Sequence, residues 1–440
     1  MQTLNNVSRV GIWGYGREGR SVLEFLRKNF PRLTVSVLVD VAPGHIGEMP
    51  SDVQLLVGDK ATASIRSGFF DLIIKSPGIS LYRREITEAK KNGVKVTSST
   101  NLWFEKNGVV GVIGVTGTKG KSTSSRLIHS LLGQAGLEGI IAGNVGIPIL
   151  DCIPGKDYTV IELSSYQIAD LCHAAPIAVI GNLYPEHGPW HGGHEQYFHD
   201  KLRIAHRNTD QIVVANSMDD RLRVLLADYS NVVWGNSESG FSAKGGRLFY
   251  GQQPVDTAGF PLQGEHNLIN LAMALGACEA FGVRQFHKKV DLSSFTQLPH
   301  RLEEFSSRSG MLCVNDSIST IPEAVIAALK TYQHRDILLI LGGTERGQDY
   351  DELLSFLQRI HVRAVALLPE TGHRLHEAIR TTTSLDSTLA SDMESAITFL
   401  SSRAKSNDIV LLSPGAPSFG GFTDFEERGK IFQELCRDLL

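Results

Sequence analysis

Short apolar runs alternate with stretches of helical spacing along the whole chain. In the first hundred residues the runs have the length of buried strands, and they lie at 9–13, 34–40, 55–59, 71–78 and 94–98. Segments with apolar positions three and four apart, such as 21–26, separate several of them. This alternation predicts a small parallel sheet with helices on its faces, ending near Thr97.

The same alternation returns twice. A second block has runs at 109–117, 158–164, 177–183 and 211–217 and a helical stretch at 262–282. A third has runs at 311–317, 336–343, 362–369 and 408–415. Richness in Val and Ile is typical of central parallel strands covered on both faces. We therefore predict an α/β protein of three consecutive domains, at 1–98, 99–297 and 298–440.

Composition is ordinary for a globular protein of this size. The chain has 440 residues, 42% of them hydrophobic and 20% charged, and a formal net charge of -4. This balance does not favour nucleic acid or an anionic membrane as a partner. Five scattered cysteines predict buried free thiols rather than a disulfide framework. Because the first residues lack the pattern of a signal peptide and no apolar stretch reaches membrane-spanning length, we expect a cytoplasmic protein.

Two glycine-rich loops follow predicted strands. The first, Gly14-Tyr15-Gly16-Arg17-Glu18-Gly19, precedes a helical pattern, and Asp40 follows about 20 residues later, as in the dinucleotide fingerprint. This motif alone fits nicotinamide, the pyrophosphate of another nucleotide, or a structural turn. A dehydrogenase is therefore one hypothesis, which an NADH-dependent absorbance change would test.

The second loop is the stronger signal. "GVTGTKGKST" at 114–123 links a strand to a helix, although Val115 departs from the strict Walker spacing. We expect the backbone N–H groups of Gly117, Thr118, Lys119 and Gly120 to face phosphates, with Lys121 neutralising them and Ser122 beside Mg²⁺. The loop ends at Thr123, and a merely structural turn is the alternative.

Further polar groups lie beside apolar segments. Glu162 ends a buried run, where α/β folds hold ligands, and a carboxylate there can hold Mg²⁺ or cap a turn. The segment 182–204 gathers four histidines, His187, His191, His194 and His199, among glycines and prolines. We interpret it as a mobile loop, and we consider zinc an unfavoured alternative because no Cys and no H-E-x-x-H pattern accompany it.

Eight motifs in order resemble the Mur ligases of peptidoglycan synthesis, relatives of folylpolyglutamate synthase. They are "TGTKGKST", "GNVG", "ELSSYQ", "EH…YFHDKLRI", "GEHN", "LPHRLE", "VNDS" and "LLSPGAPSFGGFTDFEERG". The resemblance covers nearly the whole chain and is nearest to the members that add D-glutamate to UDP-N-acetylmuramoyl-L-alanine. It implies a Rossmann-like N-terminal domain that binds UDP rather than NAD, a P-loop ATPase-like central domain and a Rossmann-like C-terminal domain that binds glutamate.

The resemblance also implies the chemistry: ATP-dependent amide formation through an acyl phosphate. Its implied catalytic residues are Lys121, Glu162, His187 and Lys201, with two Mg²⁺ ions held by Ser122, Glu162, His187 and a CO₂-derived carbamate on Lys201. From the sequence alone, Lys201 would be an exposed helix lysine. The remaining implied ATP contacts are Asn144, Asn267, Arg301 and Asp316. The implied UDP-substrate contacts are Gly14, Tyr15, Gly16, Arg17, Asp40, Ser76, Pro77 and Gly78.

Departures from the family pattern gather at the implied glutamate site of Arg346, Ser418 and Phe425. Ile318 replaces a lysine, Arg346 replaces another lysine, and Asp424 replaces an asparagine. We expect D-glutamate, as is usual in the family, with L-glutamate followed by epimerisation elsewhere as the alternative. A folylpolyglutamate synthase is more distant, because that family begins close to the ATP loop, and the retained site residues argue against a non-catalytic scaffold. We expect a monomer that acts on small molecules.

Overall fold

The computed structural model describes residues 1–41, 49–144, 147–206, 210–284, 290–295, 299–418 and 421–440. The chain forms two compact units. The first comprises Met1–Ala243, Leu248–Val255 and Ile269–Val290, and the second comprises Lys244–Arg247, Asp256–Leu268 and Asp291–Leu440. Each unit is described on its own.

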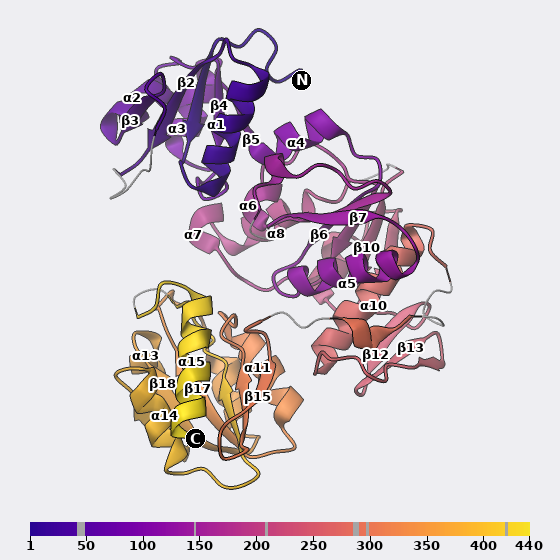
Figure 1. Cartoon of the computed structure of the whole chain (residues 1–440), viewed down its shortest axis with the longest axis vertical. Helices are drawn as coiled ribbons and strands as arrows, with labels where there is room; N and C mark the ends of the chain where they lie inside the picture. The colour runs from indigo at the N-terminus through magenta and orange to yellow at the C-terminus, as the bar shows by residue number, and fades with distance from the viewer. Residues whose placement is uncertain (42–48, 145–146, 207–209, 285–289, 296–298, 419–420) are drawn as a thin grey trace. The chain divides into compact units, whose positions relative to one another are not determined.

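The first unit begins with a parallel sheet of order β3-β2-β1-β4-β5 (Figure 1). Its strands are β1 (Arg9–Trp13), β2 (Thr34–Val39), β3 (Gln54–Val57), β4 (Leu72–Lys75) and β5 (Lys95–Ser98). Its helices are α1 (Arg17–Asn29), α2 (Asp59–Arg66) and α3 (Arg84–Lys91), and α4 (Ser99–Asn107) follows β5. All five predicted strands are confirmed. Because the strand order reverses beside β1, the carboxyl ends of β1 and β4 border the crevice where such sheets bind ligands.

A second parallel sheet of the first unit has the order β11-β10-β9-β6-β8-β7. Its strands are β6 (Val112–Thr116), β7 (Gly139–Gly143), β8 (Tyr158–Glu162), β9 (Ile177–Ile180), β10 (Ile212–Asn216) and β11 (Val232–Gly235). The helices of this region are α5 (Lys121–Gln134), α6 (Ser165–Ile168), α7 (Gly188–His191), α8 (His194–Leu202), α9 (Asp220–Leu225) and α10 (Glu265–Ala280), which belongs to the first unit from Ile269 on. The strands expected at 109–117, 158–164, 177–183 and 211–217 are confirmed, whereas β7 and β11, at the two edges, were not expected.

A small sheet of order β12-β13-β14 was also not predicted. Its strands are β12 (Phe241–Lys244), β13 (Arg247–Tyr250) and β14 (Gln253–Val255). These strands are three or four residues long, and most of their side chains are partly or fully exposed. Such short polar strands carry no clear period of two in the sequence.

The second unit holds a sheet of order β15-β16-β20-β17-β18-β19, in which only β15 pairs antiparallel. Its strands are β15 (Glu303–Ser306), β16 (Leu312–Asn315), β17 (Ile337–Gly342), β18 (Val362–Leu368), β19 (Asp386–Leu389) and β20 (Ile409–Leu412). Its helices are α11 (Pro322–Tyr332), α12 (Asp351–Leu357), α13 (Thr371–Thr382), α14 (Met393–Ser401) and α15 (Phe425–Leu439). The predicted α/β class is confirmed in both units.

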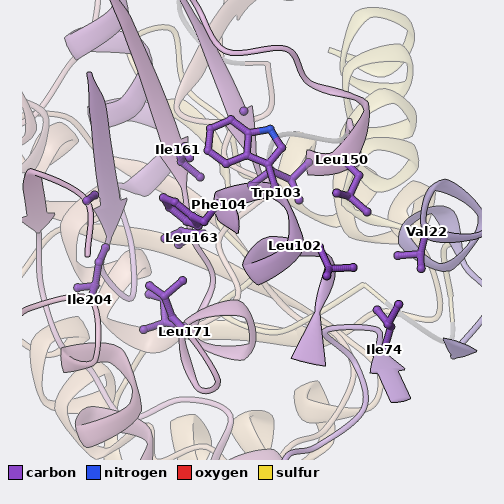
Figure 2. Packing of buried hydrophobic residues seen from close by; sticks show 14 of the residues in the cluster. Val22, Ile74, Leu102, Trp103, Phe104, Leu150, Ile161, Leu163, Leu171 and Ile204 are labelled. Carbon is purple, nitrogen blue, oxygen red and sulfur yellow. The ribbon is translucent and has the colours of Figure 1, made fainter. Parts of the chain in front are cut away.

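One apolar core joins the two large sheets of the first unit. Figure 2 shows Val22 and Ile74 from the N-terminal sheet region in the same cluster as Leu102 of α4 and Ile161 of the central sheet. The second unit has its own clusters on the two faces of its sheet. The predicted boundary at 98/99 falls between β5 and α4, while the one at 297/298 lies outside the described residues, and both stay predictions.

The cysteine prediction was only partly correct. All five thiols are free, but Cys172 is exposed and Cys152 is half-buried, while the other three are buried. Within the described ranges, no helix has the length and apolar character needed to span a membrane.

Candidate functional site

The first glycine loop is shaped by tight packing and leaves one open approach. Gly14 has φ +95°, and a Cβ there would lie 2.7 Å from the Ser76 hydroxyl. A Cβ on Gly19 would lie 2.0 Å from the Gly14 carbonyl oxygen, so both positions require glycine. A Cβ on Gly16 would meet nothing within 4 Å. Gly16 precedes α1, so a ligand phosphate could approach the backbone here.

Several predicted UDP-substrate residues already have partners inside the protein. Asp40 forms an ion pair with Arg83 at 2.6 Å and accepts a hydrogen bond from Trp13 at 3.3 Å. Arg20 lies over the Tyr15 ring, 5.4 Å from its centroid. The Gly78 carbonyl accepts from the Trp190 indole at 3.1 Å. Asp40, directly after β2, is therefore already bonded to Arg83, for which the sequence predicted no role.

The phosphate loop joins β6 to α5 as predicted, but part of its backbone is already used. Thr118 N–H donates to the Asn182 carbonyl at 2.7 Å, and Lys119 N–H donates to Asn182 Oδ1 at 2.9 Å. Asn182 therefore holds the loop by these two N–H groups, and the contact of Thr118 and Lys119 with phosphate stays a prediction. The first turn of α5, from Lys121, supplies the N–H groups that a helix cannot bond internally.

A cavity of about 350 Å³ opens beside this loop in the first unit. Its lining includes predicted residues from both large sheet regions, namely Arg17, Pro77, Thr118, Lys121, Asn144, His187 and Lys201. Lys121 Nζ donates to the Gly117 and Thr118 carbonyls at 3.1 and 3.0 Å. Glu186 also lines the cavity; it lies in one of the eight motifs, but the sequence predicted no role for it.

Glu186 binds the second lysine of the phosphate loop. Its Oε1 lies 3.1 Å from Lys119 Nζ. Burial alone would raise the pKa of Glu186, but the nearby positive charge, above all that of Lys119, outweighs it and lowers the pKa to about 2. An entering phosphate group would therefore have to share the Lys119 ammonium with the Glu186 carboxylate.

Glu162 has the geometry of a cation ligand. It ends β8 and is 1% exposed. Its Oε1 accepts from Asn144 Nδ2 at 3.0 Å, while Oε2 is buried without a hydrogen-bond partner. A buried carboxylate oxygen with no donor is costly unless something positive meets it. The structure therefore brings the predicted pair Glu162 and Asn144 together and leaves one oxygen suited to Mg²⁺.

His187 is held in an uncommon conformation at the same cavity. Its φ is +55°, in the left-handed region, and its Nδ1 lies 2.9 Å from the Tyr166 hydroxyl. Burial, only partly opposed by Glu186, lowers the pKa of His187 to about 4. A neutral imidazole is the form that coordinates metal ions, so His187 fits the predicted ligand role.

Lys201 is not the exposed lysine that the sequence alone suggested. It lies on α8 with 2% exposure, and its Nζ donates to the Gly117 carbonyl at 2.7 Å. Burial, followed by the charge of Lys121, lowers the pKa of Lys201 well below its ordinary value. The error arose because α8 places this lysine against the phosphate loop, which helical spacing does not reveal.

The histidine segment was wrongly interpreted as a mobile loop. It contains the two short helices α7 and α8, which begin directly after His187 and Gly193. His191 is buried, whereas His194 and His199 are exposed. In the part of the chain that the structure describes, no group of three His, Cys, Asp or Glu residues could hold a metal ion between them.

The "GEHNLIN" motif contributes a residue that the sequence analysis did not assign. Asn270 lies so near Gly120 that a Cβ there would be 2.5 Å from its Oδ1, and Ser124 Oγ donates to the same oxygen at 3.5 Å. The predicted residue, Asn267, donates from its side chain to the Gln263 carbonyl at 2.7 Å. Its contact with ATP stays a prediction.

In the second unit, Asp316 is buried beside Arg301. Ser413 donates to Asp316 Oδ2 at 2.8 Å and Leu302 N–H donates to Oδ1 at 3.3 Å. Burial raises the pKa of Asp316 to about 7, although Ser413 and the charge of Arg301 oppose the shift. These two predicted residues therefore share one environment at the carboxyl end of β16.

A buried arginine joins chain segments next to two of the predicted glutamate residues, Ser418 and Phe425. Arg428, not singled out from the sequence, donates to the Ser317 carbonyl at 2.7 Å and to the Ala416 carbonyl at 3.1 Å. Ser317 Oγ in turn donates to the Phe425 carbonyl at 2.8 Å. Ser418 is buried.

None of the three departures from the family pattern is a buried charge, and Asp424 is exposed. Ile318 is half-buried and Arg346 is exposed. Asp424 accepts from the N–H groups of Glu426 and Glu427 at 2.9 Å. It caps α15, which an asparagine would also do.

Comparison with known proteins assigns each part of the chain. The Mur ligase MurD-like N-terminal domain matches residues 8–98, the Mur ligase middle domain matches 115–278, and the Mur ligase glutamate ligase domain matches 300–415.

Individual relatives match over nearly their full length. A UDP-N-acetylmuramoyl-L-alanine--L-glutamate ligase of Xanthomonas euvesicatoria pv. vesicatoria is 36% identical, covering 97% of this chain and 94% of the relative. A ligase of the same name from Salinispora tropica is 34% identical, covering 98% and 97%. Among solved structures, MurF from Acinetobacter baumannii has a TM-score of 0.62 at 16% identity, covering 97% of this chain and 93% of that chain. A folylpolyglutamate synthase of Mycobacterium tuberculosis has a TM-score of 0.54 at 18% identity, but covers only 76% of this chain and 94% of that one.

Proposed function

Because this chain belongs to the Mur ligase family of ATP-dependent amide-bond ligases, we propose that it joins glutamate to UDP-N-acetylmuramoyl-L-alanine. The carboxylate of the UDP substrate attacks the γ-phosphate of ATP, giving an acyl phosphate and ADP. The glutamate amine then attacks the acyl carbon, and phosphate leaves. This route activates a poor electrophile at the expense of one phosphoanhydride bond.

One observation carries the proposal. The cavity by the phosphate loop is lined by Lys121, Lys201 and His187 on one side and by Arg17 and Pro77 of the N-terminal sheet region on the other. A carboxylate on a UDP-linked substrate and the phosphates of ATP would meet there. Of these residues Lys121 supplies a preorganised positive charge, which would stabilise the charge that develops during phosphoryl transfer.

The residues present fit Mg²⁺. Glu162 offers a buried oxygen without a hydrogen-bond partner, and His187 offers a neutral imidazole. Ser122, in the first turn of α5, completes the predicted set. A bound Mg²⁺ would act as a Lewis acid on the γ-phosphate and would offset the charge of ATP.

We propose that Lys201 carries a carbamate and that two Mg²⁺ ions act, as the family implies. An amine reacts with CO₂ in its neutral form, and burial beside Lys121 favours that form. The reaction releases a proton and gives a carboxylate-like group on Nζ. The Gly117 carbonyl, 2.7 Å from Nζ, keeps that end of the side chain at the phosphate loop.

For the amino acid we propose L-glutamate rather than the D-enantiomer expected from the sequence. The relatives from Xanthomonas, Xylella and Salinispora carry L-glutamate in their names at 34–36% identity. The changes at 318 and 346 lie in the C-terminal unit, where the amino acid would bind. Cytoplasmic location and a monomeric state stay predictions.

The test is phosphate release from ATP with UDP-N-acetylmuramoyl-L-alanine and each enantiomer of glutamate. We expect release that depends on the UDP substrate and on L-glutamate, with a product one glutamyl residue heavier by mass spectrometry. Release with D-glutamate alone would refute the stereochemical part. No release with either enantiomer would refute the function. Folylpolyglutamate synthesis is disfavoured because the likeness to that enzyme covers only 76% of this chain.

A further inference from the structure

The histidine segment contains a hydrogen-bonded chain that the proposed chemistry does not use. Asp200 and His191 are each 1% exposed, and His191 Nδ1 donates to Asp200 Oδ2 at 2.5 Å. The other ring nitrogen, Nε2, lies 3.0 Å from the Ser165 hydroxyl. Ser165 lines the ATP cavity. One end of these hydrogen-bonded side chains therefore lies at the cavity beside the phosphate loop.

The other end of this chain lies on the N-terminal sheet region. The Tyr82 hydroxyl donates to the Asp200 carboxylate, 2.6 and 2.7 Å from its two oxygens. Tyr82 is 42% exposed and follows the 76–79 turn that borders the proposed UDP site. One buried carboxylate thus accepts hydrogen bonds from both sheet regions of the first unit.

Trp190 reinforces the same contact. Its indole N–H donates to the Gly78 carbonyl at 3.1 Å, and its own carbonyl accepts from Ser80 Oγ at 2.5 Å. Its ring stacks on Tyr166 at 4.4 Å, and Tyr166 in turn contacts His187. The turn at 78–82 is therefore bound to a segment that begins at His187 and ends beside Lys201.

A buried ion pair lies next to this contact. Lys75, at the end of β4, lies 3.6 Å from Asp170, and its Nζ is 5.5 Å from the centre of the Trp190 ring. Charged groups buried in this way favour one arrangement of the two surfaces over others, because separating them would leave each charge without its partner.

We propose that Tyr82, Asp200, His191 and Trp190 are positioning residues that couple occupancy of the UDP site to the placement of His187 and Lys201. The inference rests on the proposed function, since it takes the 76–79 turn as part of the UDP site. A substrate bound at this turn orders the 78–82 segment. That segment contacts α7 through Trp190 and the last turn of α8 through Asp200, and these two helices position the two predicted metal ligands. ATP with its metal then binds more tightly when the UDP substrate is present.

The experiment measures this coupling by calorimetry on the full-length protein. A non-hydrolysable ATP analogue with Mg²⁺ is titrated with and without UDP-N-acetylmuramoyl-L-alanine, and Mn²⁺ binding is followed in parallel by electron paramagnetic resonance. In the wild-type protein we expect the UDP substrate to tighten analogue binding at least about fivefold. In Tyr82→Phe, which removes only the hydroxyl of a partly exposed side chain, we expect that factor to fall toward one and the KM for the UDP substrate to rise more than kcat falls.

Tyr158→Phe is the matched control. It removes a hydroxyl bonded to His129 Nδ1 at 2.9 Å, outside the cavity lining, and should leave the coupling factor as in wild type. His191→Phe should act as Tyr82→Phe does, and Tyr82→Phe keeps the test valid if His191→Phe fails to fold. An unchanged coupling factor in Tyr82→Phe, or none in the wild-type protein, would overturn the inference. Absence of UDP-substrate binding in wild type would instead refute the proposed function.

Discussion

The two proposed substrate regions are built in opposite ways. Around the phosphate loop the side chains are buried and mutually bonded: Lys201 is 2% exposed, Glu162 is 1% exposed, and Glu186 is paired with Lys119. In the C-terminal unit the candidate cation, Arg346, is exposed, and the loops are fixed by Arg428 through main-chain carbonyls. The first arrangement fixes charges in place before ATP arrives. The second fixes a backbone and leaves the candidate side chain, Arg346, exposed, so on the proposed function the choice of amino acid can change while the phosphate chemistry is kept.

Of the substitutions that test this comparison, we expect Lys201→Ala to have the largest effect on activity. Lys201→Ala should lower kcat by about 10²–10³-fold, because it removes a preorganised charged group from the phosphate end. Acetate should restore part of the rate by supplying carboxylate oxygens, and ATP binding should persist. Lys156→Ala, on a surface lysine that is 69% exposed, is the control. Full activity in Lys201→Ala would contradict the carbamate proposal.

A smaller but selective effect is expected at Gly16. Gly16→Val should weaken UDP-substrate binding about tenfold and leave ATP binding unchanged, because the side chain would fill the open approach to α1. Calorimetry with each nucleotide measures this. Gly133→Val, where a Cβ also meets open space but at the far end of α5, is the control. Tight NADH binding to the wild-type protein would show that the loop serves a dinucleotide.

At Arg346, in the C-terminal unit, we expect a change in the KM for glutamate only. Arg346→Ala should raise the KM for glutamate about tenfold while the KM for ATP stays within about twofold, since a charged hydrogen bond contributes about 1.5–3 kcal/mol. Arg335→Ala, another exposed arginine of the same unit, is the control. Ile318→Lys should shift the ratio of D- to L-glutamate turnover. If neither variant alters glutamate kinetics, the substrate carboxylate is bound elsewhere.

The smallest effect concerns stability against pH in the C-terminal unit. Burial raises the pKa of Asp316 to about 7 in the folded protein, from an ordinary value of 3.8. Folding therefore favours the protonated form. Its stabilising contribution is complete below about pH 4 and is lost as the pH rises to about 7. In Asp316→Asn, denaturant midpoints should depend less on pH across this window, and an unchanged dependence would contradict the assignment.

The strand pattern could be predicted where strands are buried on both faces. The runs at β1, β6 and β17 are largely apolar, all their residues except Arg9 are buried, and they were predicted. Edge strands such as β7 and β19 are half-exposed, and their residues carry no clear period. The short strands β12 to β14 were not predicted for the same reason, since their pairing with one another rather than a local sequence pattern makes them strands.

The residues of the candidate site could also be predicted only where the local sequence determines their surroundings. Glu162 was found because a carboxylate at the end of a buried strand has few structural uses. Lys201 and His191 were misjudged because their burial depends on α7 and α8 packing against the phosphate loop. Arg428 was missed because its partners, Ser317 and Ala416, come from loops 111 and 12 residues away along the chain. Such contacts leave no trace in spacing or composition.

The shared apolar core of the first unit has a consequence for how the protein unfolds. Val22, Leu102 and Ile161 belong to one cluster although they come from two sheet regions (Figure 2). Loss of either sheet would expose the side chains of the other, so the two regions should melt in a single cooperative transition. The second unit keeps its own clusters around Leu339 and Leu338 and can melt separately. A scanning calorimeter would then record two heat-absorption peaks from a chain with three family domains.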